Sequence, residues 1–357
     1  MRSLRPLLRV LLVATLGVVG ALLAWLSDGS FAATVVLLVE PLLWVALSWL
    51  VWWVWTSGAR GSAWALLAGG VAAALACRAP LAPEELVGMD EAPFGSRMRT
   101  CARSLGLPAG PVRILSWSPE LVGPGFVEAV TEAQADVVIV RAPLSEALVE
   151  AIRAGVGGEV MELDGDGASR WVFARGVFDA CGHSDRWFDR PAPGAELGAV
   201  FVQLEGGTRL PLLTATMPPP RAVARWSRHV ADARAALAAT ANTLESSLLV
   251  VAVEAPYALA APRLTRSLLQ AGLLPMARRP NWPGVVPLHT FDQLWAAEAW
   301  VAGDSRVLSA PGAGRLGQLA ELAPRWPVTL PASRDGDPVR HEHDRRVEHL
   351  QHHARAE

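Results

Sequence analysis

The chain has 357 residues, of which 52% are hydrophobic, and its formal net charge is −2. All 32 basic residues are arginine, and the near-neutral balance leaves no basic surplus for binding nucleic acid. Three scattered cysteines are too few for a disulfide framework or a cysteine-rich metal site. So high a hydrophobic content indicates that part of the chain lies in lipid.

Three apolar segments, residues 10–26, 31–55 and 63–77, open the chain. A membrane-spanning helix needs ~17–25 largely apolar residues, a length that the first two segments reach and the third approaches. The second segment ends in a group of tryptophans, which are enriched where a membrane meets water. These are Trp44, Trp49, Trp52, Trp53 and Trp55. The pattern predicts about three transmembrane helices within residues 1–78, with membrane lipid as a partner.

The placement of arginines predicts the topology. Arg2, Arg5 and Arg9 precede the first segment, and basic residues of this kind remain on the cytoplasmic side. With three spans, the chain leaves the inner (cytoplasmic) membrane on its outer side near Arg78, so the following domain is periplasmic or extracytoplasmic. If the third segment does not span, that domain lies in the cytoplasm instead.

Beyond a Pro- and Gly-rich linker at residues 79–111, strands and helices alternate. A strand opens at Val112 and breaks at Pro119. Further strands are expected at 136–140, 170–174, 197–204, 210–215, 248–253, 291–296, 299–301 and 306–310, followed by a last segment at 316–322. The strands at 170–174, 197–204 and 210–215 are predicted to form one antiparallel set. Helices are expected at 126–135, 144–154, 223–244 and 263–271. The charged, His-rich tail at 324–357 is predicted to be disordered, because it cannot bury enough apolar surface.

Several stretches resemble, in order, motifs of the endonuclease/exonuclease/phosphatase superfamily. VRILSWS resembles its opening strand ending in SWN, DVVIVRAP resembles DVVLLQEV, LPLLTATMPPP resembles the strand into NVHLPPP, LLVVAVEAP resembles the strand ending in GDFN, NWP and FDQLW resemble TWP and IDHVL, and PGAGRLGQLAEL resembles PGSDHRPLVAEL. The resemblance covers residues 112–323. It implies an α/β (α+β) four-layer sandwich, two mainly antiparallel β-sheets flanked by helices, as in bacterial members that carry membrane spans ahead of this domain.

The family's chemistry is not matched residue by residue. Its members hold Mg²⁺ or Mn²⁺ with carboxylates and position an attacking water with a His–Asp pair. At the matching positions this chain has Ser118 for Asn, Ala142 for the metal-binding Glu, Thr216 for His, Val253 for Asp and Arg315 for His, and only Asp292 is retained. Since each lost acid–base group costs ~10²–10⁴ in rate, we expect a vestigial pocket without a metal or another cofactor.

The sequence therefore favours a membrane-anchored, catalytically degenerate domain that binds or scaffolds an unidentified protein or ligand. One alternative is an active metal-dependent phosphodiesterase or nuclease with a rearranged site, using Mg²⁺ or Mn²⁺ with His289, Asp292 and Ser118. Another is that the membrane segments, with Glu40 beside Pro41, carry the function. Asp164–Gly167 and His183–Asp185 contain residue types of calcium and triad sites, and we interpret them as a turn and a surface loop.

Overall fold

The computed structural model describes Thr15 and residues 40–56, 60–78, 110–163, 170–178, 196–219, 226–244, 246, 248–255, 262–277, 279–281 and 290–325. The described strands form two six-stranded sheets. The first sheet has the order β11-β12-β1-β2-β4-β3, and the second has the order β5-β6-β7-β8-β10-β9. Each sheet contains one parallel pair among its described strands, β1–β2 or β7–β8, and its other pairs are antiparallel. The prediction of two mainly antiparallel sheets is confirmed.

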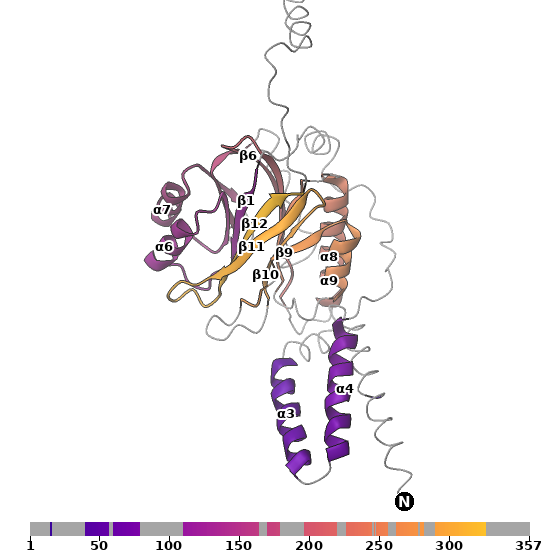
Figure 1. Ribbon diagram of the computed structural model, residues 1–357. Helices are drawn as coiled ribbons and strands as arrows, with labels where there is room; N and C mark the ends of the chain where they lie inside the picture. The colour runs from indigo at the N-terminus through magenta and orange to yellow at the C-terminus, as the bar shows by residue number, and fades with distance from the viewer. Residues whose placement is uncertain are drawn as a thin grey trace, which may run out of the picture. The chain divides into compact units, whose positions relative to one another are not determined.

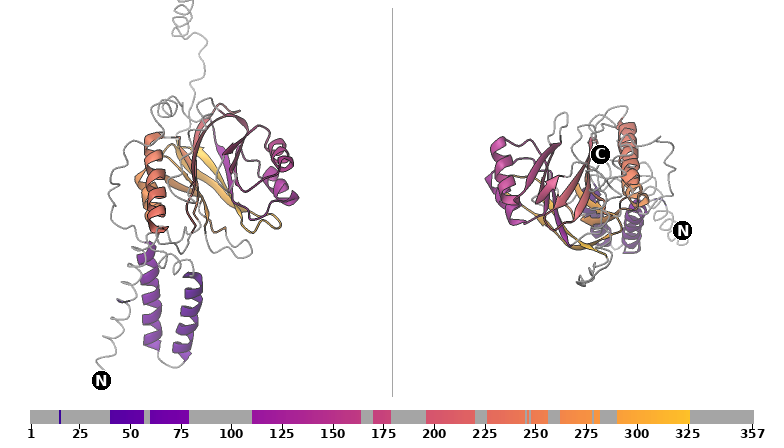
Figure 2. Two further views of the ribbon diagram at one scale, coloured as in Figure 1. Left: turned by 180° about the vertical axis from the view of Figure 1, so that it is seen from behind. Right: turned by 90° about the horizontal axis from the view of Figure 1, so that it is seen from above.

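Each sheet is built from six described strands. The first sheet consists of β1 (Val112–Trp117), β2 (Val137–Arg141), β3 (Glu159–Leu163), β4 (Arg170–Ala174), β11 (Trp300–Leu308) and β12 (Gly317–Pro324). The second consists of β5 (Gly176–Phe178), β6 (Glu196–Leu204), β7 (Arg209–Thr216), β8 (Val250–Glu254), β9 (Leu274–Ala277) and β10 (Asp292–Ala296). The helices α6 (Pro124–Glu132) and α7 (Glu146–Val156) flank the first sheet, and α8 (Trp226–Leu244) and α9 (Pro262–Gln270) flank the second (Figures 1 and 2).

The central strands β2, β7, β8 and β10 are buried on both faces, which explains their near-continuous apolar sequences. Because successive side chains of a strand point to opposite faces, β1 sends Ile114 into the core between the sheets and Leu115 beneath α6 and α7. In the same way β8 sends Val250 between the sheets and Val251 beneath α8 and α9. Three apolar cores therefore separate four layers, as the predicted sandwich requires.

The pairing of three segments differs from the sequence-based expectation. Strand β4 pairs with β2 and β3 of the first sheet. The antiparallel set predicted for 170–174, 197–204 and 210–215 is therefore wrong for 170–174, whereas the other two segments do pair as β6 and β7. The two short strands expected at 299–301 and 306–310 are one strand, β11, with an irregular register between Ala302 and Ser305. Strands β3, β5 and β9 are short edge strands that carry little of the alternation used for prediction.

Among the described residues ahead of the sandwich are the helices α3 (Glu40–Thr56) and α4 (Arg60–Arg78). They contact each other near the turn between them, where Trp55 and Trp64 meet edge to face at 5.8 Å. The guanidinium of Arg60 lies 5.8 Å from the centre of the Trp55 ring. Within the described part of the chain, no helix is both long and apolar enough to cross a bilayer. Most of the first predicted span, residues 31–39 and residues 326–357 of the predicted tail lie outside the described residues, whereas Pro324 at the start of that tail ends strand β12.

Candidate functional site

One end of the space between the sheets is lined by polar side chains instead of apolar ones. In the second sheet the strand register aligns four residues in a row across β6, β7, β8 and β10, and these are Glu196, Thr216, Glu254 and Asp292. In the first sheet Ser118 follows β1, and Arg141 at the end of β2 is paired in register with Arg170 of β4. Directly paired residues have their side chains on the same face of a sheet, so the side chains of the two rows face each other across the space between the sheets. We call this end of the sandwich the mouth.

Asp292 is the centre of the mouth and is completely buried. Its Oδ1 accepts a hydrogen bond from the Ser118 hydroxyl at 2.6 Å and another from Arg141 Nη1 at 3.2 Å. Its Oδ2 accepts from Asn281 Nδ2 at 2.8 Å. Each carboxylate oxygen is therefore occupied by a donor of the protein itself.

Asn281 fixes the other side of this carboxylate. The same Nδ2 also donates to the Leu316 carbonyl at 3.0 Å, and its Oδ1 accepts from the Phe291 backbone N–H at 2.7 Å. Asn281 is completely buried, and its amide ties three segments together beside Asp292. An amide held in this way gives Asp292 a fixed donor that cannot turn toward a ligand.

Arg141 carries the positive charge next to Asp292, and only 2% of its side chain is exposed. Besides Asp292, its Nη1 donates to the Ser116 hydroxyl at 2.9 Å, and its Nη2 donates to the Ala252 carbonyl at 3.0 Å. Arg141 thus joins strands of both sheets. Burying a guanidinium is tolerated only when it is paired and hydrogen-bonded, and all of these contacts satisfy that condition.

Two further arginine–carboxylate pairs complete the cluster. Arg170, almost fully buried, places its Nε 3.1 Å from Glu196 Oε2 and donates from Nη1 to the Thr214 hydroxyl at 3.3 Å. Arg315 donates from Nη1 to Glu254 Oε1 at 2.7 Å, and its guanidinium carbon lies 5.0 Å from the centre of the Phe291 ring. Within the described residues, three arginines therefore face three carboxylates at the mouth.

Burial raises the pKa of Asp292 from its ordinary value of 3.8 to about 6. Arg141 opposes this rise, the negative charge of Glu254 adds to it, and the hydrogen bond from Ser118 and the charge of Arg315 also hold the pKa down. Asp292 is consequently ionised at neutral pH, where it balances the charge of Arg141.

The structure brings together only part of the predicted vestigial pocket. Ser118 and Asp292 are in direct contact, Arg315 reaches the same end through Glu254, and Thr216 lies half-buried beside Glu254 in the row. Ala142 and Val253 do not join them. The period of two along β2 and β8 turns Ala142 toward α6 and α7 and Val253 toward α8 and α9.

The residues that sequence reasoning missed are the immediate neighbours of those two, Arg141 and Glu254, together with Asn281. Arg141 shares the face of Val137 and Ile139, and Glu254 shares the face of Val250 and Ala252. A charged residue closing an apolar strand on its inward face was the available signal. His289, Asp164–Gly167 and His183–Asp185 lie outside the described residues, so the interpretations placed on them stay predictions.

A divalent cation does not fit the described residues of the mouth. Among the side chains that the structure describes, no group of three or more His, Cys, Asp or Glu could hold a metal ion. The three carboxylates of the described mouth, Asp292, Glu254 and Glu196, are each already paired with an arginine. Mg²⁺ and Mn²⁺ require several oxygen ligands, mostly anionic, and a guanidinium beside each carboxylate repels them.

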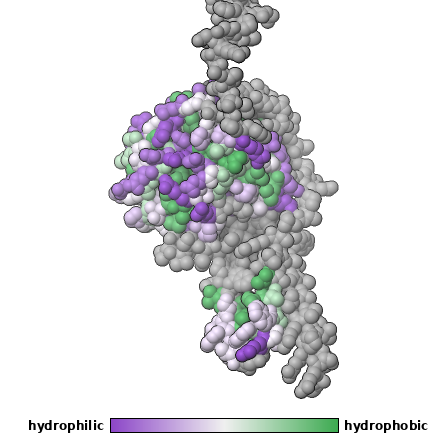
Figure 3. Space-filling model, in the orientation of Figure 1, coloured by the Kyte–Doolittle hydropathy of each residue, from purple (hydrophilic) through white to green (hydrophobic). Residues whose placement is uncertain are grey.

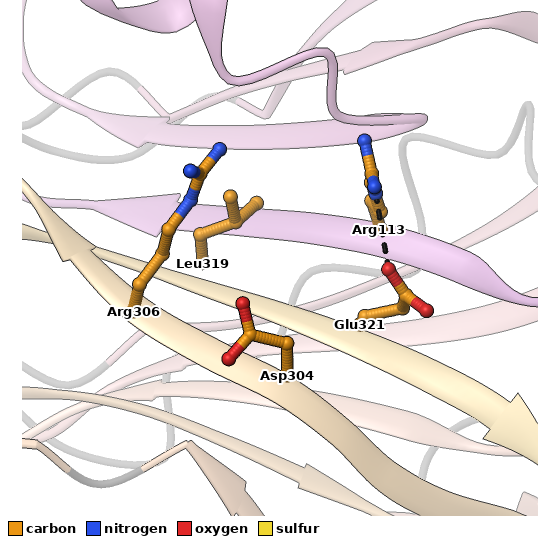
Figure 4. Close-up of a pocket in the computed structure, with 5 residues that line it drawn as sticks. All are labelled: Arg113, Asp304, Arg306, Leu319 and Glu321. Carbon is orange, nitrogen blue, oxygen red and sulfur yellow. Dashed lines mark hydrogen bonds and ion pairs between the residues drawn. The ribbon is translucent and has the colours of Figure 1, made fainter.

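A second charged area lies on the outer face of the first sheet, where β1, β12 and β11 carry Arg113, Glu321, Leu319, Asp304 and Arg306 around a hollow of about 100 Å³ (Figure 4). Arg113 Nε lies 3.2 Å from Glu321 Oε2, and Arg306 extends over Leu319. Hydrophilic and hydrophobic side chains are interspersed on the face turned to the viewer in Figure 3. The charged area around Arg113 is open to solvent, whereas the mouth is buried.

No family model and no curated protein matches the chain, whereas solved structures do. An endonuclease/exonuclease/phosphatase from Beutenbergia cavernae is 14% identical over 60% of this chain and 72% of its own, with a TM-score of 0.43. A family protein from Bacteroides thetaiotaomicron is 8% identical over 60% of this chain and 95% of its own, with a TM-score of 0.43. The human Nocturnin catalytic domain is 13% identical over 62% of this chain and 97% of its own, with a TM-score of 0.41.

The two bacterial neighbours are endonuclease/exonuclease/phosphatase proteins. They are of the family that the sequence motifs resemble. The order and pairing of the described strands define the fold of the chain.

Proposed function

We propose that this protein is a membrane-anchored, catalytically degenerate member of the phosphodiesterase-type sandwich proteins, and that it acts by binding or scaffolding. The observation that carries the proposal is Asp292, whose two carboxylate oxygens accept from Ser118, Arg141 and Asn281. Three of its roughly four lone-pair sites are then taken by donors of the protein, and Arg141 balances its charge, which makes this carboxylate a poor ligand for a metal ion.

The group at the position of the family's histidine also argues against hydrolysis. Arg315 is held to Glu254 at 2.7 Å, and a guanidinium stays protonated at any physiological pH. It cannot take a proton from an attacking water, whereas general-base catalysis requires a group that titrates near the working pH. Ser118 offers a hydroxyl, but that hydroxyl donates to Asp292 inside a buried cluster.

The test is hydrolysis by the purified full chain. We expect no Mg²⁺- or Mn²⁺-dependent cleavage of DNA, of a chromogenic phosphodiester or of a phospholipid vesicle above that of buffer. Metal-dependent turnover that is lost in Asp292→Asn, while the variant keeps the circular dichroism spectrum of the wild type, would overturn the proposal. It would favour the active phosphodiesterase or nuclease with a rearranged site.

Membrane anchoring is supported by the composition and surface of α3 and α4. No charged residue follows Glu40 within α3, and Trp49, Trp52, Trp53 and Trp64 each expose more than half of their surface. Exposed apolar and aromatic surface on this scale is typical of sites that contact lipid or a partner. We propose the inner membrane as the location, with the sandwich on its periplasmic side.

Two measurements test the anchor. The full chain should float with vesicles in a density gradient and resist extraction by high salt and alkali, whereas a peripheral protein is released. Protease added to spheroplasts should cut the sandwich if it is periplasmic. Cleavage only in inverted vesicles would instead place the sandwich in the cytoplasm.

A further inference from the structure

The guanidinium of Arg141 is surrounded by oxygen atoms from both sheets. Its hydrogen-bond partners are a carboxylate oxygen of Asp292 on β10, the hydroxyl of Ser116 on β1 and the main-chain carbonyl of Ala252 on β8, at 2.9 to 3.2 Å. All three contacts are made by the two terminal nitrogens. Nε is buried and makes no hydrogen bond within the described residues. Within the described residues, the two terminal nitrogens of the guanidinium therefore make all of its hydrogen bonds.

The three oxygens are of the kinds that bind small cations. Carboxylates, hydroxyls and main-chain carbonyls are the usual ligands of hard metal ions in proteins, and they accept equally well from guanidinium N–H groups. Two of them are held in place without Arg141, because Ala252 lies within the β8 ladder and Asp292 is also fixed by Ser118 and Asn281. A cage of oxygens thus exists around the position that the guanidinium fills.

We infer that the mouth contains a cation site that the chain fills with its own Arg141, and that shortening this side chain opens the site to a small cation from solution. The inference rests on the proposed function, since it explains why the wild-type mouth takes no external metal. Arg141 is then an internal counter-ion for Asp292. Without it, the buried carboxylate has lost its nearest positive charge, and a cation that enters regains that attraction.

The neighbouring arginine sets a limit on what enters. Arg170 is paired with Arg141 in the strand register and faces Glu196, so its own charge is balanced separately. Two arginines side by side repel each other, which the carboxylates opposite offset. A vacated Arg141 position is therefore surrounded by net negative charge from Asp292 and remains selective for one small cation.

The experiment compares the full chains of wild type, Arg141→Ala, Arg141→Ala with Asp292→Asn, and Arg113→Ala. The probes are millimolar guanidinium chloride and MnCl₂, with Tm measured by circular dichroism and free Mn²⁺ measured by electron paramagnetic resonance. Arg113 is the matched control, because its guanidinium also lies 3.2 Å from a carboxylate but on the open face. The His-rich tail is present in every variant, so only differences between variants count.

We expect at least one probe to raise the Tm of Arg141→Ala saturably, by roughly 3–6 °C at ten times its Kd. Wild type, Arg113→Ala and the double variant should show no such rise, since their sites are filled, unaltered or without the carboxylate. Arg141→Gln, which is neutral and shorter, is measured in the same way, so that a failure of the alanine variant to fold still leaves a test.

The inference is overturned if the Arg141 variants respond to neither probe, or respond no more than the wild type or the double variant. That result would leave the absence of hydrolysis in the wild type untouched. Conversely, metal-dependent turnover by the wild type would overturn the proposed function whatever the variants bind, so the two proposals fail separately.

Discussion

Two arginine–carboxylate pairs of this protein have the same nitrogen–oxygen separation and opposite surroundings. Arg141 and Asp292 lie 3.2 Å apart at the mouth with 2% and 0% of their side chains exposed. Arg113 and Glu321 lie 3.2 Å apart on the outer face of the first sheet with 45% and 35% exposed. Water and salt screen the second pair, whereas the first has only the protein to compensate its charges. Burial, not distance, therefore decides how much each pair matters.

The residues around the buried pair are also buried, whereas those around the exposed pair are open to solvent. Asp292 is held by Ser118 and Asn281 as well as by Arg141, so that each of these donors depends on the others. Arg113 and Glu321 stand beside Asp304 and Arg306 in a hollow open to solvent (Figure 4). A connected buried network specifies one arrangement of the mouth, and loss of one member leaves the rest unsatisfied.

The largest expected effect comes from removing the charge of Arg141. We expect Arg141→Met to lower the free energy of unfolding by about 3–5 kcal/mol, because it leaves Asp292 buried without its counter-ion. Urea unfolding of the full chain at pH 7.5 measures this loss. Asp292→Asn in the same background should restore most of the stability, since a pair replaced by neutral groups of similar size often costs little. A double variant no more stable than Arg141→Met would show that packing, and not charge, is what the mouth requires.

A smaller effect follows from the pKa of Asp292. Because the folded protein holds this proton more tightly than the unfolded chain, the contribution of Asp292 to stability is complete below pH 4 and is lost as the pH rises through about 6. The rise from 3.8 to about 6 corresponds to about 3 kcal/mol. The wild type should therefore lose stability relative to Asp292→Asn between these pH values. Parallel profiles for the two proteins would mean that Arg141 fully offsets the burial of the carboxylate.

Ser118 and Ser116 provide a matched pair of buried hydroxyls on opposite partners of the ion pair. Ser118 donates to Asp292, and Ser116 accepts from Arg141. We expect Ser118→Ala to cost roughly 1.5–3 kcal/mol at pH 8, less at pH 5, and to move the Asp292 transition to higher pH, because its hydrogen bond favours the ionised form. Ser116→Ala should leave the position of the transition nearly unchanged. If both variants moved the Asp292 transition by the same amount, Ser116 would influence the ionisation of Asp292 as strongly as Ser118 does. The two serines would then not act on separate partners.

The sandwich could be predicted from the sequence because its central strands are buried on both faces. Runs such as Val137–Val140 and Leu248–Val253 are apolar throughout, which is typical of strands covered by helices and by a second sheet, and strands β2 and β8 form there, shifted by one or two residues from the expected bounds. Strand pairing could not be predicted in the same way. Strand β4 is as apolar as its neighbours in sequence, and nothing in a single strand states which sheet it joins.

The site was harder to predict than the fold, for a related reason. When both faces of a strand are apolar, the pattern does not say which face is turned toward the partner sheet. The motif resemblance points to Ala142 and Val253, which face the helices, whereas their neighbours Arg141 and Glu254 face the other sheet. The strand period, together with the charged residue beside each apolar run, would have moved the prediction by one residue, to Arg141 and Glu254. Asn281 lies in a short segment after β9 and contacts Asp292 only through the tertiary fold, so no local signal precedes it.

The smallest expected effect belongs to the exposed pair and completes the comparison. Arg113→Ala should lower the free energy of unfolding by no more than about 1 kcal/mol, and the loss should shrink further when salt screens the pair. The backbone N–H of Arg113 donates to Asp136 at 2.8 Å, and that hydrogen bond survives the substitution. Urea unfolding at low and high ionic strength measures both quantities. A loss as large as that of Arg141→Met, insensitive to salt, would mean that the outer face is covered by a partner in the folded protein and that its charges are not free in solvent.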